Sequence, residues 1–165
     1  LCKTKDLGAR LQERDPEAIG ILMEALVGVG IAMAYVGNSR PASGSEHHMS
    51  HFWEMRYIAL NRFPELHGIK VGLATPIIAE MFELMKDQVP ECAMEICPTR
   101  EQVENLLKTA GAPVDPVAIG IDRDLFHESM LGAYKVRKRY SILQLALDEG
   151  RLEECTDKIT ERIYG

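Results

Sequence analysis

Three histidines lie within five positions of the chain, at His47, His48 and His51, directly after a turn-forming segment. In a helix that begins near Ser45, His47 and His51 are four residues apart and project from one face. This spacing lets two imidazoles reach one small volume, as in helical metal sites and proton relays. His48 is rotated by about 100° and is expected to point elsewhere, to the surface or behind the site. A cluster of exposed or capped histidines would show the same pattern.

Two predicted helices carry the histidines, with His47, His48 and His51 on the first and His67 at the start of the second. The first covers residues 45–61 and carries an apolar stripe, and Pro64 follows its end. The second covers residues 69–87, and His67 lies at or just before its N-terminus. The partial positive charge of a helix N-terminus favours the neutral imidazole, which is the form that binds a metal. Pro76 lies inside this second helix and is expected to kink it.

An apolar segment precedes the histidines. Asp15, Pro16 and Glu17 form a typical helix start, and the helix is predicted to end near residue 36. It is apolar almost all round, so it is predicted to be central to the bundle. Glu24 and internal glycines favour a core helix over a membrane span. Close contact with another helix, or with a ligand, would explain the glycines at Gly20, Gly28 and Gly30.

The remaining segments are also predicted to be helical. Thr99 and Gln102 form a capping-box pair that opens a short helix. Further helices are predicted over residues 122–139, 141–149 and 153–164, and no alternating strand pattern competes with them. The fold class is therefore all-α, a multi-helix bundle formed by residues 1–165 as a single domain.

Composition limits the classes of function. The formal charge of −6 argues against a nucleic-acid surface, which needs a basic face. The hydrophobic fraction is 46% in 165 residues, which is enough to form one hydrophobic core without stabilisation by disulfides or structural metals. Four scattered cysteines form no zinc or disulfide framework and suit free thiols in a reducing cytoplasm. No membrane span and no signal peptide are predicted.

Three stretches resemble a known enzyme family. SRPASGSEHHMSHFWEM (residues 39–55), LHGIKVGLAT (66–75) and KVRKRYSILQLALDEG (135–150) are similar to segments of the glycerol-1-phosphate dehydrogenases. That family is related to glycerol dehydrogenase, the iron-containing alcohol dehydrogenases and dehydroquinate synthase. The resemblance implies a dehydroquinate synthase-like C-terminal helical domain, whose active site faces an N-terminal nucleotide-binding domain across a cleft.

The resemblance also implies residue roles. One Asp and two His hold a divalent metal in the family, and the two histidines match His47 and His67 here. His51 matches a residue that contacts substrate and handles a proton in dehydroquinate synthase. Arg40 lies seven residues before His47, as does a phosphonate-binding Arg in that enzyme, and a guanidinium suits phosphate oxygens. An arginine at a surface turn would be the alternative.

Ser43 and Gly44 are expected to add donors for substrate at the helix N-terminus, which is a natural anion site. Capping is the alternative role for Ser43 and for Ser45. His127 lacks a histidine partner at helical spacing and is interpreted as structural.

The chain departs from the family in one respect. No segment before His47 resembles the ligand Asp or the glycine-rich nucleotide-binding motif, so the chain is interpreted as the C-terminal domain of a longer enzyme. The resemblance implies NAD(P)-dependent interconversion of dihydroxyacetone phosphate, a small phosphorylated three-carbon substrate, and glycerol 1-phosphate. It implies Zn, Ni or Fe as the metal, and NAD or NADP bound mainly by the absent domain.

Two other interpretations stay open. One is a different polyol or alcohol dehydrogenase, or a dehydroquinate synthase-like enzyme, of the same superfamily. The other is a non-catalytic helical module, because the isolated domain is expected to be inactive. A homo-oligomer is a further expectation from the resemblance.

Overall fold

The structure, a computed structural model, describes residues 7–165, which form helices and loops without a strand. The all-α prediction is therefore confirmed for these residues. The α-helices are α1 (Gly8–Gln12), α2 (Pro16–Val36), α3 (Ser45–Ala59), α4 (His67–Leu84), α5 (Glu91–Met94), α6 (Arg100–Thr109), α7 (Arg123–Gly132), α8 (Ile142–Asp148) and α9 (Leu152–Tyr164). Three short 3-10 helices connect them: η2 (Arg40–Ala42), η3 (Pro116–Ile119) and η4 (Ala133–Val136).

Local capping explains where several helices begin. The Asp15 side chain accepts a hydrogen bond from the backbone N–H of Glu17 at 2.9 Å, which confirms the predicted start of α2. Thr99 and Gln102 form the predicted capping box of α6. These contacts satisfy N–H groups that have no partner inside the helix, and they involve neighbouring residues only. A sequence pattern can therefore predict them.

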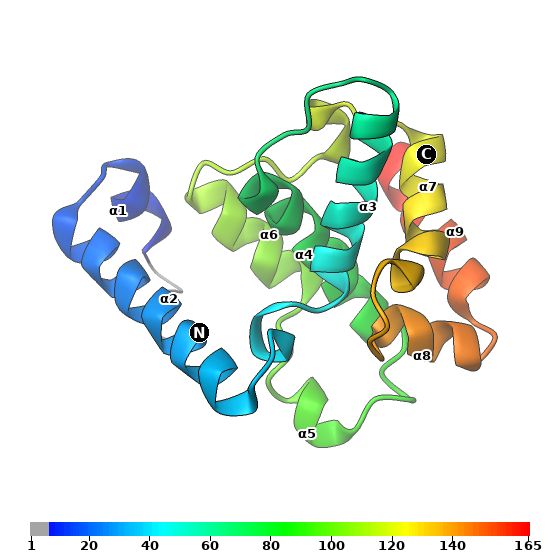
Figure 1. The fold of residues 1–165 in the computed structure, drawn as a ribbon, viewed down its shortest axis with the longest axis horizontal. Helices are drawn as coiled ribbons and strands as arrows, with labels where there is room; N and C mark the ends of the chain where they lie inside the picture. The colour runs from blue at the N-terminus through cyan, green and yellow to red at the C-terminus, as the bar shows by residue number, and fades with distance from the viewer. Residues whose placement is uncertain (1–6) are drawn as a thin grey trace.

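The core forms where α3 packs against α4 (Figure 1). Trp53 of α3 and Leu73 of α4 are fully buried there. The helix α7 packs against α3, and α8 and α9 pack against α4. These helices contribute to the core the fully buried side chains Phe126, Leu143 and Ile159. This arrangement places one face of α3, and the N-terminal turn of α4, beside each other at the edge of the core.

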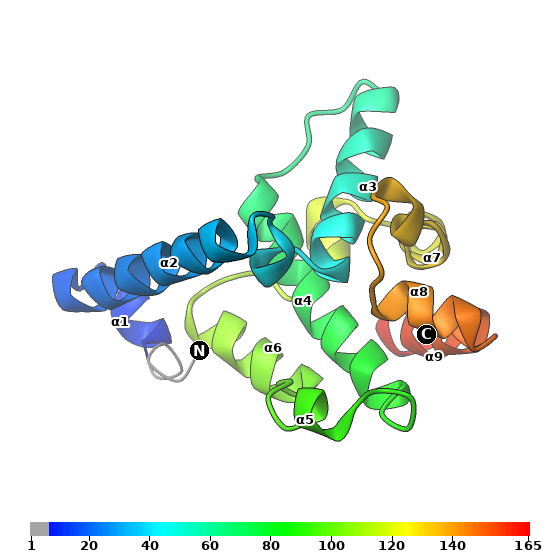
Figure 2. The same ribbon diagram turned by 60° about the horizontal axis from the view of Figure 1, so that its bottom comes forward.

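The position of α2 differs from the prediction. Figures 1 and 2 both show α2 extending away from the helices that form the core. Ala18 is its one buried residue, and Leu26 is 56% exposed. A Cβ added at Gly20, Gly28 or Gly30 would meet nothing within 4 Å. The prediction of a central helix with close glycine contacts is wrong for this chain, because the described residues offer no surface that covers the full circumference of α2.

By length and composition alone, α2 could cross a membrane. Its most apolar window has a mean hydropathy of 2.0 and is not buried. A core helix of a soluble protein meets the same criterion, so length and composition do not assign the helix to a bilayer.

The segment predicted as one helix over residues 122–139 is divided. The α-helix α7 ends at Gly132, η4 follows, and the backbone is extended at Arg137. A Cβ at position 132 would lie 2.9 Å from the Phe52 ring of α3, so the chain passes α3 more closely than a larger residue would allow. The extended segment then brings Arg137 and Arg139 alongside the N-terminal half of α3.

The two histidine-bearing helices also end earlier than predicted. The helix α3 ends at Ala59 rather than residue 61, where Asn61 adopts a left-handed backbone conformation with φ of 53°. The helix α4 begins at His67 itself and ends at Leu84. His67 therefore lies in the first turn of α4, as the sequence predicted.

The burial difference between α4 and α2 gives a stability prediction. Leu73→Ala should lower the free energy of unfolding of this chain by about 2–5 kcal/mol, because it removes buried contacts and leaves a cavity. Leu26→Ala on exposed α2 is the matched control and should change the free energy of unfolding by less than about 0.5 kcal/mol. Urea denaturation followed by circular dichroism measures both. Equal losses from the two variants would contradict the observed placement of α2.

Candidate metal centre

Three imidazole rings meet where α3 faces the N-terminus of α4. The ring centroids of His47 and His67 are 5.3 Å apart, and those of His51 and His67 are 5.2 Å apart. His47 and His51 lie one helical turn apart on α3, and His67 approaches both from α4. The structure thus brings together the three histidines that the sequence selected.

Neighbouring polar groups orient two of these rings. His47 Nδ1 donates to Glu46 Oε1 at 2.8 Å, and the same oxygen accepts from the backbone N–H of Gly44 at 2.7 Å. The Ser50 hydroxyl lies 3.2 Å from His67 Nδ1. In each ring the Nδ1 atom is engaged, which leaves Nε2 for a metal. Metal-binding histidines are commonly held in this way by a second polar partner.

A carboxylate completes a possible ligand set. His51, Glu54 and His67 each offer a ligand atom, and these atoms all lie within 4.8 Å of one another. Glu54 was not selected from the sequence, although it follows His47 by seven positions and therefore shares the helix face of His47 and His51. Two imidazoles and a carboxylate form a typical donor set for zinc or iron. The residues present therefore fit a divalent metal.

A buried lysine, Lys70, lies close to the Glu54 carboxylate. Lys70 is fully buried, and its Nζ lies 3.3 Å from Glu54 Oε2. The contact is an ion pair without hydrogen-bond geometry, since Lys70 Nζ has no hydrogen-bond partner. Glu54 also lies 3.7 Å from His51 Nδ1. Removing Glu54 would leave the ammonium without compensation, which is strongly unfavourable for a buried charge.

Partial burial and nearby cations lower the pKa of two of the rings. Burial is the largest cause that lowers the pKa of His51, and the Arg137 guanidinium, 3.3 Å from His51 Nε2, adds to it. Burial also lowers the pKa of His67, with further contributions from His47 and Lys70. The neutral imidazole is the form that binds a metal or accepts a proton.

A pocket of about 330 Å³ adjoins the cluster on the side of Glu46. Its lining includes all three predicted substrate-binding residues, Arg40, Ser43 and Gly44. His48 also lines it and is 1% exposed, so of the two positions expected for His48 the surface position is wrong. The reason is that the face of α3 that carries His48 lies against residues 139–141, and the sequence pattern did not predict the path of this segment.

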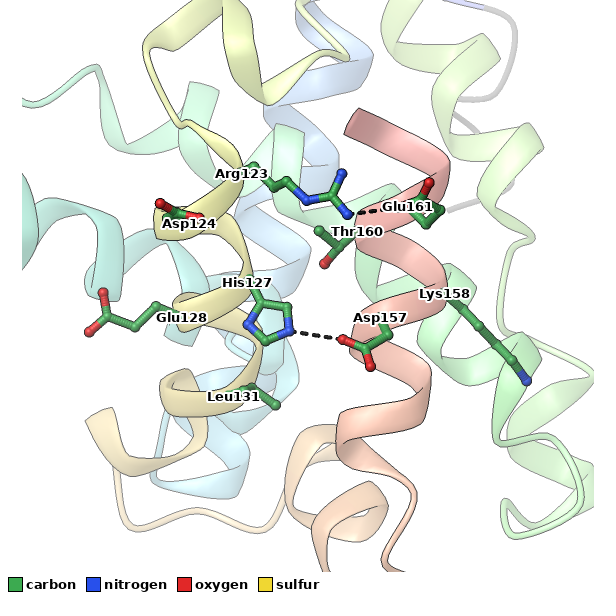
Figure 3. Close-up of a pocket in the computed structure, with 9 residues that line it drawn as sticks. All are labelled: Arg123, Asp124, His127, Glu128, Leu131, Asp157, Lys158, Thr160 and Glu161. Atoms are coloured by element: carbon green, nitrogen blue, oxygen red, sulfur yellow. Dashed lines mark hydrogen bonds and ion pairs between the residues drawn. The ribbon is translucent and has the colours of Figure 1, made fainter. Parts of the chain in front are cut away.

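A second pocket, of about 900 Å³, lies between α7 and α9 and is separate from the histidine cluster. Figure 3 shows His127 of α7 directed at Asp157 of α9, with a separation of 3.0 Å between Nε2 and Oδ1. Arg123 and Glu161 form a second ion pair across it at 2.7 Å. These pairs connect two helices, in agreement with the structural interpretation of His127.

Cysteine chemistry does not contribute to the cluster. Cys92, Cys97 and Cys155 are free thiols, as predicted, and Cys2 lies outside the described residues. Burial raises the pKa of the thiols of Cys97 and Cys155. Both thiols therefore stay protonated and unreactive near neutral pH.

The described residues form an all-helical domain with an imidazole and carboxylate cluster at its edge, and the donor set of this cluster fits a divalent metal. No family model matches the chain. Curated relatives do: it is 32% identical over 164 residues to the glycerol-1-phosphate dehydrogenase [NAD(P)+] of Geobacillus thermodenitrificans, covering 84% of this chain and 40% of the relative. It is 39% identical over 139 residues to the enzyme of the same name from Methanococcus vannielii, covering 83% and 39%.

A third relative, from Bacillus licheniformis, has the same name and is 30% identical over 92% of this chain. These similarities show that the chain is homologous to the glycerol-1-phosphate dehydrogenases. The chain spans about 40% of the length of these relatives.

The lowered histidine pKa values predict a pH-dependent stability. The pKa of His51 and of His67 lies below the ordinary value of 6.5 in the folded chain, so the unfolded chain takes up these protons first as pH falls. The free energy of unfolding should therefore decrease as pH falls through about 6.5.

Urea denaturation at several pH values between about 7.5 and 5.5 measures this slope. His51→Gln removes one of the titrating groups, so its slope should be shallower than that of the wild type. A wild-type stability that is constant across this range, or that rises on acidification, would contradict the lowered pKa values of His51 and His67.

Proposed function

We propose that this chain is the metal-binding helical half of an NAD(P)-dependent sn-glycerol-1-phosphate dehydrogenase. The enzyme would interconvert dihydroxyacetone phosphate and glycerol 1-phosphate. One observation supports the proposal: the three-imidazole cluster lies beside the pocket that contains Arg40, so donors suited to a metal adjoin a guanidinium suited to a phosphate. The names of the homologues agree with this chemistry.

His47 and His67 would hold the metal through their Nε2 atoms, while Glu46 and Ser50 fix the two ring orientations. A bound divalent ion would act as a Lewis acid on the substrate oxygen. In the reductive direction, NAD(P)H gives a hydride to the carbonyl carbon and a proton is added to the carbonyl oxygen. The products are glycerol 1-phosphate and NAD(P)+.

His51 would transfer that proton. Its ring lies beside the proposed ligands, and Arg137 disfavours the imidazolium, so a proton taken up by His51 is readily released. Proton transfer by a positioned histidine contributes typically about 10²–10⁴-fold to a rate. The ring does not need to bind the metal for this role.

Arg40, Ser43 and Gly44 would receive the substrate phosphate in the pocket next to Glu46. Gly44 is the N-cap residue of α3, and no side chain caps this helix. The first N–H groups of α3 are therefore available to an anion, and the helix dipole favours negative charge there.

NAD or NADP would be bound mainly by parts of the enzyme outside these 165 residues. By this proposal the isolated chain is inactive in turnover and the longer enzyme acts in the cytoplasm. A homo-oligomer is also proposed, by the same resemblance.

The proposal predicts metal-dependent turnover in the longer enzyme that contains this chain. After a chelator has removed bound metal, NAD(P)H oxidation with dihydroxyacetone phosphate should require added Zn²⁺ or Ni²⁺. His67→Ala should abolish this oxidation even when metal is added. His127→Ala, in the separate pocket, is the control and should retain activity. Oxidation of an unphosphorylated polyol alone would instead support another dehydrogenase of the superfamily. Absence of both metal binding and turnover would leave a non-catalytic helical module.

The ligand assignment predicts a pattern of metal affinities in this chain. Zn²⁺ titration against a chromophoric chelator should show weaker binding after His47→Ala or His67→Ala. Ser50→Ala should weaken Zn²⁺ binding about 10- to 100-fold, because the His67 ring loses the hydroxyl that orients it. If Glu54→Gln and His51→Ala weaken binding while His47→Ala does not, the metal is held by His51, Glu54 and His67 instead.

A further inference from the structure

The pocket beside Glu46 contains buried polar groups that have no partner in the protein. Ser45 is 2% exposed and His48 is 1% exposed, and neither the Ser45 hydroxyl nor either ring nitrogen of His48 has a hydrogen-bond partner. The Ser141 hydroxyl, which lines the same pocket, also lacks one. Buried side-chain polar atoms in proteins are nearly always hydrogen-bonded. Three such groups around one cavity indicate a ligand that accepts hydrogen bonds.

The charges around the pocket favour an anion. Arg40 and Arg139 both line it, and Arg139 Nη1 donates to Ser39 Oγ at 2.9 Å, which fixes the guanidinium beside η2. The carboxylate of Glu46 is turned to the Gly44 N–H and to His47. Two guanidinium groups thus face a cavity whose one carboxylate is already engaged.

The donors match a tetrahedral oxyanion. The guanidinium of Arg139 offers several N–H donors, each serine hydroxyl offers one, and an imidazole has at least one N–H donor in either tautomer. Ser141 precedes α8 without capping it, so its hydroxyl is free to donate into the pocket. The uncapped N-terminus of α3 adds backbone N–H groups on the same side.

We propose that Arg139 and Ser141, together with Ser45 and His48, form the binding site for a phosphomonoester group in this pocket. This assignment rests on the proposed function and extends it from Arg40 to a second segment of the chain, after η4. Arg139 and Ser141 are residues that bind the substrate phosphate, and they lie about a hundred positions beyond Arg40 in the sequence.

Two sources of phosphate share this chemistry, the three-carbon substrate and the nicotinamide dinucleotide. The volume of about 330 Å³ is near the lower limit of ligand pockets, which range from roughly 300 to 1,000 Å³. A small phosphomonoester fits that size better than a dinucleotide. The substrate is therefore the source assigned here.

The first test uses this chain and inorganic phosphate as the probe. Isothermal titration should show saturable binding, weakened about 10- to 100-fold in Arg139→Gln because a charge-assisted hydrogen bond to the anion is lost. Ser141→Ala should weaken it by a smaller factor. Lys138→Gln is the matched control, because Lys138 is adjacent and exposed but does not line this pocket, and it should bind as the wild type does.

Circular dichroism of each variant shows whether it is folded. Two results would overturn the assignment: no saturable phosphate binding by the wild-type chain, or wild-type affinity in folded Arg139→Gln and Ser141→Ala together. Arg139 also contacts Ser39, so Ser39→Ala tests this contact separately. It should lower phosphate affinity less than Arg139→Gln does.

The second test separates this inference from the proposed function. In the longer enzyme, Arg139→Gln should raise the KM for dihydroxyacetone phosphate by about 10- to 100-fold, with kcat and the KM for NAD(P)H little changed. Inorganic phosphate should compete with dihydroxyacetone phosphate and not with the nucleotide. A rise in the nucleotide KM alone would assign the pocket to the cofactor and overturn the substrate assignment.

An unchanged KM in an active enzyme would refute the role of Arg139 and leave the dehydrogenase proposal intact. An enzyme that never reduces dihydroxyacetone phosphate would refute the proposed function, while the phosphate titration of the chain would still decide whether the pocket binds this anion.

Discussion

The packing of α3 against α4 is the contact on which the arrangement of the polar side chains depends. Trp53 and Leu73 are fully buried between these helices and the elements that cover them. Because side chains four positions apart share a helix face, burying one face of α3 fixes the direction of His47 and His51 as well. The same contact brings the first turn of α4, with His67, to that face. The apolar core therefore determines the geometry of the candidate metal centre.

The ion pair between Lys70 and Glu54 connects this core to the chemistry. Lys70 is buried, so its ammonium needs the carboxylate nearby, and this need holds Glu54 close to His51. After partial burial and the charge of His47, the positive charge of Lys70 is a further cause that lowers the pKa of His67. In a protein interior such charges act over short distances with little screening. A single buried cation thus helps to set both the position of a carboxylate and the protonation of an imidazole.

Local signals in the sequence predicted the start of α2, the capping box of α6 and the shared face of His47 and His51, because each depends on neighbouring residues or on helical periodicity. The place of His67 beside them was implied by the family resemblance and not by a local pattern. The position of α2 was not predictable, since it depends on which surfaces the chain offers to an apolar helix. Burial of Lys70 and His48, and the approach of Arg139 to Ser39, depend on contacts between distant segments. Arg139 was missed because its neighbours lie far along the chain, whereas Glu54 was missed although it shares the helix face of His47 and His51.

The histidine cluster and the pocket beside Glu46 also differ in how far apart their parts lie in the sequence. The histidines of the cluster and the Glu46, Ser50, Glu54 and Lys70 side chains beside them lie in two consecutive helices joined by a short loop. Closing a short loop costs little chain entropy, and local contacts form quickly during folding. The contact of Arg139 with Ser39 spans 100 positions and closes a far longer loop. We therefore expect the histidine cluster to assemble early in folding and the pocket beside it to assemble late.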